Sequence, residues 1–323
     1  MRTGTRTGDH WQMVWDGVGG NRVRWAELPD MVRKSIEVAV GSTVVDAVSQ
    51  PGGFSPGLAA RLRLADGRRV FAKAVSGTRL AEAVAFHRRE AGVAGRLPAG
   101  VTAPRLLWSG GGDDWAALVF EDVAGHTPAL PWRPADWRRV HDALVTLAAD
   151  LTPSPVDLPP IGHDPGLFSG WRSLAAEPAL AAVLEPWARD VDRLAELEAG
   201  WPEAAAGDTL VHFDLRADNI LLAGERVLFV DWPHAAVGAP WVDLLCMLPS
   251  VAMQGGPAPA DVWRASPLTV RADPAAVDRV LAALTGFFVH SSLLPAPPGL
   301  VTLRRFQRLQ GEQALAWLRS RLR

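Results

Sequence analysis

The residues best suited to chemistry lie in one polar segment between apolar stretches. It reads His212-Phe213-Asp214-Leu215-Arg216-Ala217-Asp218-Asn219, and Val230-Asp231 follows after two further apolar runs. Phosphoryl transfer needs a carboxylate that orients the acceptor hydroxyl and takes its proton, and oxygen ligands for Mg²⁺. Asp214 suits the first task, while Asn219, five residues later, and Asp231 offer the amide and carboxylate oxygens that Mg²⁺ prefers. We therefore predict that Asp214 is catalytic and that Asn219 and Asp231 bind metal.

A cation is also needed to hold the α- and β-phosphates of a nucleotide. Only Lys34 and Lys73 are lysines among 33 basic residues, and Lys73 follows an Asp66-Gly67 turn signal on an expected strand. Glu90 lies seventeen residues further on, in an expected helix, and is predicted to pair with Lys73. Glu82, in the same helix, is the alternative partner.

A glycine-containing loop precedes Lys73. It reads Gln50-Pro51-Gly52-Gly53-Phe54-Ser55-Pro56-Gly57. Gly52 and Gly53 are predicted to cover the phosphates, and the alternative is an ordinary hairpin turn. The chain has no Gly-Lys-Ser/Thr motif of the kind that defines a P-loop, so a P-loop enzyme is disfavoured.

The elements that must position these residues change in character along the chain. Residues 1–35 are an extension of uncertain structure. Strands are expected at 38–49, 58–64, 70–75, 104–108 and 115–121, with one helix at 80–94. After residue 124 helical periodicity dominates, including a stripe over 184–194 and a helix that Asp273-Pro274 would start. A hairpin over 210–231, turning at Gly224-Glu225, interrupts the helices. The pattern predicts an α+β fold with a β-rich N-lobe (36–123) and a mostly helical C-lobe (124–323).

Composition restricts the environment. Hydrophobic residues make up 48% of the chain, which is enough for a substantial core. The net charge of −2 gives no general reason to expect nucleic acid or an anionic membrane as a partner. Cys246 is the single cysteine, so no intrachain disulfide can form, and we expect a cytoplasmic protein. No apolar run reaches the ~18 residues of a membrane span. The oligomeric state stays open.

The polar segment 212–219 and the following Val230-Asp231 resemble motifs of the aminoglycoside phosphotransferase family. This family also contains choline kinase-like and fructosamine kinase-like members and shares the protein-kinase fold. The family pattern is approximately His-Gly-Asp-Leu-His-Pro-Gly-Asn, then a hairpin ending Ile-Asp-Trp. Here the second part reads Val230-Asp231-Trp232, and Gly238-Ala239-Pro240-Trp241-Val242-Asp243-Leu244 resembles the Gly-x-Pro-x-x-Asp-Leu that follows. The departures are Phe213 for glycine, Arg216 for histidine, Asp218 for glycine, and Pro233 where many relatives carry an acid. None of them removes a chemically required group, so catalysis stays plausible and only the identity of the substrate is left open.

The resemblance implies a protein-kinase-like two-lobed fold and an ATP-dependent kinase with Mg²⁺. Its acceptor would be a hydroxyl of a small molecule, either an antibiotic-like compound or a metabolite. The adenine would contact the hinge, in which Phe120, Glu121 and Val123 are the candidate residues. Asp243 is expected to cap a helix or brace the loop.

Three questions stay open at this stage. The ten acids of residues 157–208 could bind a cationic acceptor, or they could belong to the solvent-exposed face of a helix. We favour the second interpretation. A catalytically silent nucleotide-binding or interaction module of the same fold is one alternative to a kinase. A metal-dependent phosphoesterase using His212, Asp214, Asp231 and His234 is another. A protein kinase is disfavoured, because no Asp-Phe-Gly or Ala-Pro-Glu signature follows the loop.

Overall fold

The computed structural model describes residues 22–50, 57–77, 80–181, 190–297 and 300–323. Its described part divides into two compact units. The N-terminal unit contains residues 22–128 together with 218–235, and the C-terminal unit contains 129–217 and 236–323. A short segment from the middle of the chain therefore packs with the N-terminal unit. The lobe limits predicted from the sequence, 36–123 and 124–323, stay a prediction.

The N-terminal unit is built on an antiparallel sheet of five strands in the order β1-β2-β3-β5-β4. The strands are β1 (Val44–Ser49), β2 (Leu58–Leu64), β3 (Arg69–Ser76), β4 (Leu106–Gly112) and β5 (Trp115–Glu121). Gly67 has a φ of 87° in the turn between β2 and β3, a conformation that glycine adopts without steric cost. The β-rich N-terminal part expected from the sequence is confirmed.

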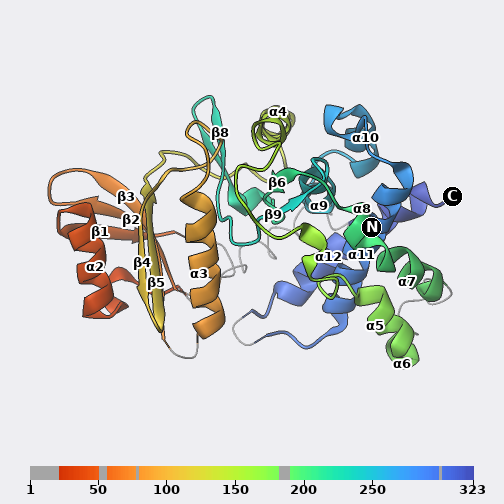
Figure 1. Ribbon diagram of the computed structural model, residues 1–323, viewed down its shortest axis with the longest axis horizontal. Helices are drawn as coiled ribbons and strands as arrows, with labels where there is room; N and C mark the ends of the chain where they lie inside the picture. Colours follow the sequence, from red (N-terminus) through yellow and green to blue (C-terminus); the bar gives the residue numbers. More distant parts are fainter. Residues whose placement is uncertain (1–21, 51–56, 78–79, 182–189, 298–299) are drawn as a thin grey trace, which may run out of the picture. The chain divides into compact units, whose positions relative to one another are not determined.

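Two helices cover opposite faces of this sheet (Figure 1). The first, α2 (Asp30–Val40), packs Val32 and Ile36 against the side chains of β2 and β3 that point the same way. The second, α3 (Ala81–Ala94), packs against the face that carries Ala116 and Leu118 of β5. The alternation of β5 residues explains this arrangement, because successive side chains point to opposite faces of a sheet.

The helix α2 corrects the expectation of a strand from Val38, and it begins at Asp30, within the extension whose structure the sequence left uncertain. Its last residues, Val38-Ala39-Val40, suggest a strand by their β-branched composition. They continue the helix because Ile36, four residues after Val32, keeps the apolar side on the sheet. Gly41, with a φ of 69°, ends the helix.

The segment around the predicted catalytic loop forms two separate strand pairs. β6 (Thr209–Val211) pairs with β9 (Ala236–Gly238), and β7 (Ile220–Ala223) pairs with β8 (Arg226–Phe229) across the Gly224-Glu225 turn. The predicted hairpin with its Gly224-Glu225 turn is confirmed as β7–β8, but its expected bounds, 210–231, are too wide, because β6 pairs with β9 instead. β6 is too short for its partner to be read from the sequence, and that partner lies 25 residues away in the chain.

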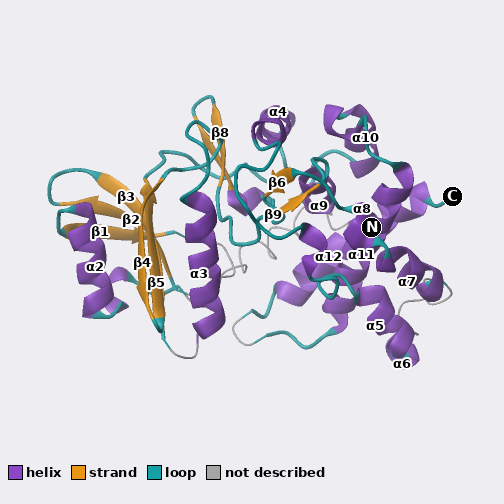
Figure 2. Cartoon of the chain, viewed as in Figure 1, coloured by secondary structure: helices purple, strands orange, loops and turns teal. Residues whose placement is uncertain are grey.

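The C-terminal unit is mostly helical (Figure 2). Its helices are α4 (Pro134–Asp150), α5 (Gly170–Ala176), α6 (Pro178–Ala181), α7 (Val191–Ala199), α8 (Trp201–Ala204), α9 (Val242–Met253), α10 (Pro259–Ala265), α11 (Pro274–Leu293) and α12 (Leu303–Arg321). Short 3-10 turns occur at Trp25–Glu27, Ile161–His163, Ala217–Asn219 and Pro267–Thr269. The Asp273 carboxylate accepts hydrogen bonds from the first turn of α11, which confirms the predicted start of that helix.

The longest helix of this unit, α11, packs against α12, α5 and α7. Part of the expected 184–194 helix lies outside the described residues, and α7 begins at Val191. Among the described residues, no helix combines the length and the apolar character that a membrane span requires. The predicted α+β fold is confirmed.

Candidate active site

Lys73 lies at the centre of a charged cluster in the N-terminal unit. Its Nζ donates hydrogen bonds of 2.7 Å to Glu90 Oε1 and of 2.7 Å to Asp231 Oδ1. The Glu90 side chain is 4% exposed, whereas those of Lys73 and Asp231 are 15% and 28% exposed. Strand β3 contributes Lys73, helix α3 contributes Glu90, and the segment after β8 contributes Asp231. Lys73 therefore pairs with Glu90, while Glu82 lies exposed in the first turn of α3.

The three charged side chains form two ion pairs that share Lys73, in an environment that is largely shielded from water. Burial acts to lower the pKa of Lys73, but the carboxylates of Asp231 and Glu90 outweigh it and raise that pKa above its usual value. Burial raises the pKa of Glu90 against the opposing effect of Lys73. His87, on the same helix, has its pKa lowered to about 4, chiefly by burial and then by the charge of Lys73. His87 is therefore neutral at pH 7, and Lys73 is the cation that contacts both carboxylates, while the charge of Arg22 also acts on Asp231.

Asn219 and Asp231 lie at the same open end of the β7–β8 hairpin. Ile220 pairs with Phe229, and the backbone N–H of Val230 donates to the carbonyl of Asn219 at 3.0 Å, so the hairpin brings the two residues together. Asn219 is 4% exposed. Asp231 has a φ of 71°, an unfavourable conformation for a residue other than glycine and one that is often found at functional sites. One amide and one carboxylate oxygen are a ligand set that fits Mg²⁺.

The predicted hinge follows directly from β5. Phe120 and Glu121 belong to β5, where Phe120 pairs with Phe71 and with Leu106. The carbonyl of Val123 accepts a hydrogen bond from Arg61 at 2.8 Å.

Arg61 of β2 organises this hinge and was missed in the sequence. Its guanidinium contacts the carbonyls of Val123 and Gly125, and Nε lies 3.2 Å from the carboxylate of Asp122. The available signal was the alternation of arginine with apolar residues in β2. Alternation alone cannot distinguish Arg61 from Arg63, which is half exposed and lies 3.8 Å from Asp46.

The glycine loop is only partly described. Gly52 and Gly53 lie in the 51–56 segment, outside the described residues. Gly57 is described, and its φ is 111°. A Cβ at this position would overlap the carbonyl oxygen of Ala74 in the neighbouring strand, so β2 can begin here only with glycine.

Asp214 lies in the C-terminal unit, in the loop after β6. Its carboxylate is paired with the Arg216 guanidinium at 3.0 Å, and the two side chains are 27% and 16% exposed. The Asp214 backbone N–H donates to Nδ1 of the buried His212 at 3.3 Å. Arg216 also lies over the ring of Phe306, 6.0 Å from its centroid. Arg216 thus holds the carboxylate of Asp214 and His212 holds its backbone, which gives the carboxylate a defined position from which it could orient a hydroxyl group.

Asp243 of α9 braces this loop, as expected from the sequence. Its two carboxylate oxygens accept the backbone N–H groups of His212 at 2.8 Å and of Phe213 at 2.7 Å. Burial raises the pKa of Asp243 to about 6, against the lowering effect of those two hydrogen bonds. Phe213 has a φ of 64°. Asp243 therefore holds in place a backbone conformation that phenylalanine seldom adopts.

The remaining candidates have ordinary structural roles. Asp192 and Glu196 are on the exposed side of α7, while Val191 and Leu194 are buried. Glu198 is fully buried and accepts hydrogen bonds from the backbone of Trp171 and Arg172. Asp192 and Glu196 thus lie on a solvent-exposed helix face, as we favoured, and Glu198 is a structural carboxylate, whereas Glu185, the third acid expected on that face, lies outside the described residues.

The second histidine of the phosphoesterase alternative, His234, packs its ring against Phe86, with 5.1 Å between the ring centroids. Within the described part of the chain, no three His, Cys, Asp or Glu side chains gather as a metal-ligand group.

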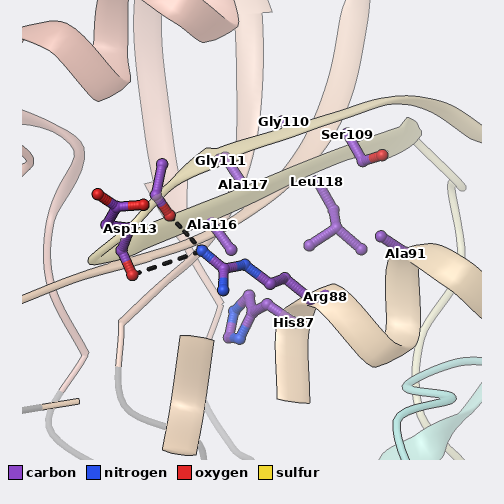
Figure 3. A pocket seen from close by; sticks show the side chains of 11 residues that line it. His87, Arg88, Ala91, Ser109, Gly110, Gly111, Asp113, Ala116, Ala117 and Leu118 are labelled. Atoms are coloured by element: carbon purple, nitrogen blue, oxygen red, sulfur yellow. Dashed lines mark hydrogen bonds between the residues drawn. The ribbon is translucent and has the colours of Figure 1, made fainter. Parts of the chain in front are cut away.

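A separate cavity of about 410 Å³ lies in the N-terminal unit between α3 and the β4–β5 strands (Figure 3). Arg88 crosses it and donates to the carbonyls of Gly112 and Asp113. His87 and Leu118 also line it, but none of the predicted site residues does.

Comparison with known proteins supports the resemblance seen in the motifs. The family model described as "Phosphotransferase enzyme family" matches residues 52–280, which is more than half of the chain. The comparison with curated proteins gave no match.

Several solved structures have a similar fold. A thermostable mutant of aminoglycoside phosphotransferase APH(4)-Ia, crystallised with AMP-PNP and hygromycin B, is 14% identical with a TM-score of 0.59, over 90% of this chain and 99% of its own. A choline/ethanolamine kinase family protein from Mesorhizobium loti is 17% identical with a TM-score of 0.55, over 91% and 94%. A macrolide 2'-phosphotransferase type I is 16% identical with a TM-score of 0.51, over 82% and 92%.

Proposed function

Since the chain belongs to the phosphotransferase enzyme family, we propose that it transfers the γ-phosphate of ATP to a hydroxyl group of a small molecule. The acceptor would be an antibiotic-like compound or a metabolite. We place the protein in the cytoplasm, where ATP is abundant and the single Cys246 can stay reduced.

One observation carries the proposal: Lys73 bonds to both Glu90 and Asp231. A largely buried lysine fixed by a glutamate on the next helix is a cation of defined position, as phosphate binding requires. Its second partner, Asp231, lies beside Asn219, and their oxygen atoms are those we assign to Mg²⁺. Bound Mg²⁺ supplies positive charge to the phosphates as the negative charge redistributes during transfer.

Each remaining residue has a task in this proposal. Asp214 accepts the proton of the acceptor hydroxyl and orients its oxygen towards the phosphorus. Lys73 binds the α- and β-phosphates. The backbone of the Phe120–Val123 hinge binds the adenine, and the loop with Gly52 and Gly53 covers the phosphates. The family membership and the fold of AMP-PNP-bound APH(4)-Ia support the nucleotide assignment.

The test is ADP release from Mg-ATP with a panel of hydroxyl compounds, for the wild type and Asp214→Ala. We expect acceptor-dependent ADP release that falls by about 10²- to 10⁴-fold in the variant. Asp208→Ala is the matched control, because this exposed aspartate precedes β6 in the same unit. Thermal unfolding of both variants separates a chemical loss from a folding loss. Undiminished turnover in Asp214→Ala contradicts the proposal, and Mg-ATP binding without turnover of any acceptor favours the silent module.

A further inference from the structure

An aromatic cluster adjoins the loop of Asp214 in the C-terminal unit. The ring of Phe168 lies 5.7 Å from that of Phe213, 5.6 Å from that of Phe287 and 5.0 Å from that of Trp201, measured between centroids. Phe168 and Trp201 are buried, whereas Phe213 and Phe287 stay partly exposed. The cluster therefore has a buried base and an accessible edge, and that edge includes the residue directly before Asp214.

The backbone conformation of Phe213 is an unfavourable one for its residue type. A φ of 64° places its Cβ close to the backbone, a steric cost that glycine does not have. The two hydrogen bonds to Asp243 hold the loop in this conformation. Strained residues that the surrounding structure holds in place gather at functional sites, which makes the ring of Phe213 a candidate ligand contact.

Basic side chains lie on the loop of Asp214 and at the start of α12. Arg216 pairs directly with Asp214 and lies over the ring of Phe306 in α12. The first turn of α12 contains Arg304 and Arg305 and no acidic residue. Over residues 240–323 the sequence has nine arginines against five acids. Like charges repel at short range, so this composition disfavours an acceptor with several positive charges.

From these two features we infer that the acceptor is an uncharged or anionic hydroxyl compound with a planar aromatic body. The aromatic body packs against the exposed edges of Phe213 and Phe287, which brings a hydroxyl of the same molecule to Asp214. Ring packing of this kind contributes both apolar burial and a preferred geometry. The inference rests on the proposed function, since it names the substrate class of that site.

The test compares three groups of acceptors by kcat/KM in the ADP-release assay with Mg-ATP. The first is aromatic and uncharged or anionic (nucleosides, aryl glycosides, hydroxylated aryl carboxylates). The second contains the matching alkyl glycosides, which lack the aromatic ring. The third is cationic (aminoglycosides, choline). We expect the best aromatic acceptor to exceed the best members of both other groups by about tenfold or more.

Variants then locate the ring contact. Phe213→Gly removes the ring and suits the positive φ, so we expect a rise of about tenfold in the acceptor KM with the ATP KM unchanged. Phe287→Leu gives a second measurement should Phe213→Gly unfold. Phe288→Leu is the control, because the Phe288 ring is 8% exposed and lies 5.3 Å from that of Phe287, behind the edge.

Three results overturn the inference: a cationic or alkyl acceptor that is the best substrate, no turnover in the aromatic group, or equal acceptor KM values for Phe213→Gly, Phe287→Leu and wild type. If Mg-ATP binds but none of the three acceptor groups supports ADP release, the kinase assignment is wrong and so is the acceptor class. If a cationic acceptor is turned over in an Asp214-dependent manner, the kinase assignment stands and the acceptor class alone is wrong.

Discussion

The carboxylate of Asp243 lies 2.7 Å from the backbone nitrogen of Phe213 and holds that residue in a left-handed conformation. This contact links the start of α9 to the loop that carries Asp214. Because Asp243 is buried and its pKa is raised to about 6, the contact depends on pH within the range in which enzymes are usually assayed.

We expect the activity to fall as the pH drops through about 6, because protonated Asp243 loses part of its capacity to accept the two backbone hydrogen bonds. Asp243→Asn should show low activity without this titration. The measurement is kcat/KM from pH 5 to 8 for both proteins. An unchanged profile in Asp243→Asn contradicts the assignment.

The same group has an opposite effect on stability. The pKa is about 6 in the folded protein and 3.8 in its reference state, so the folded state binds the proton more tightly. The free energy of unfolding therefore falls as the pH rises from about 4 to 6, by about 3 kcal/mol at a little over one kcal/mol per pKa unit. Denaturant unfolding of wild type against Asp243→Asn should show this difference, and Asp261→Asn, at an exposed residue, should not.

Lys73→Ala should abolish Mg-ATP binding and destabilise the N-terminal unit. Glu90 would stay buried without its counter-charge, which costs about 3 kcal/mol in comparable pairs. Lys34→Ala is a matched control, since Lys34 is the other lysine of the chain and is exposed. Calorimetric titration with Mg-ATP and denaturant unfolding measure the two effects. Equal behaviour of the two variants would remove Lys73 from the nucleotide site.

Arg61→Ala should weaken ATP binding by loosening the hinge. It removes the hydrogen bonds to the carbonyls of Val123 and Gly125 and leaves the largely buried Asp122 without its ion pair. We expect the ATP KM to rise about tenfold, with a smaller effect on kcat. Arg63→Ala, two residues along the same strand, should be close to wild type because its ion pair is exposed. An effect of Arg63→Ala as large as that of Arg61→Ala would argue against this role.

Gly57→Ala should destabilise the sheet more than Gly41→Ala. Both glycines have positive φ, so each substitution costs about 1 kcal/mol in backbone strain. Only at Gly57 does the new Cβ also meet backbone, the carbonyl oxygen of Ala74, and this should bring the total to about 3 kcal/mol. Thermal and urea unfolding of the two variants compare them directly. Similar losses at both positions would show that β2 and β3 separate easily here.

Local sequence patterns predicted much of the fold and of the candidate site of this chain. The strands around Asp66-Gly67, the Asp273 cap and the β7–β8 turn follow from alternation and turn chemistry, which act over a few residues. The motif with Asp214 and Asn219 is likewise local, because a loop that places polar groups at fixed spacing is written in consecutive residues.

The tertiary structure decided which of several equivalent residues are used. Glu82 and Glu90 share one helix, and the packing of α3 against the sheet turns Glu90 to Lys73 and leaves Glu82 in solvent. Arg61 and Arg63 share one strand, and the path of the chain after β5 brings Val123 to Arg61 alone. The helix α2 and the pairing of β6 with β9 were also decided at this level. Residue type and spacing indicate which chemistry a side chain can perform. Its burial and its partners depend on segments that are far apart in the chain, and only the packed fold brings those segments together.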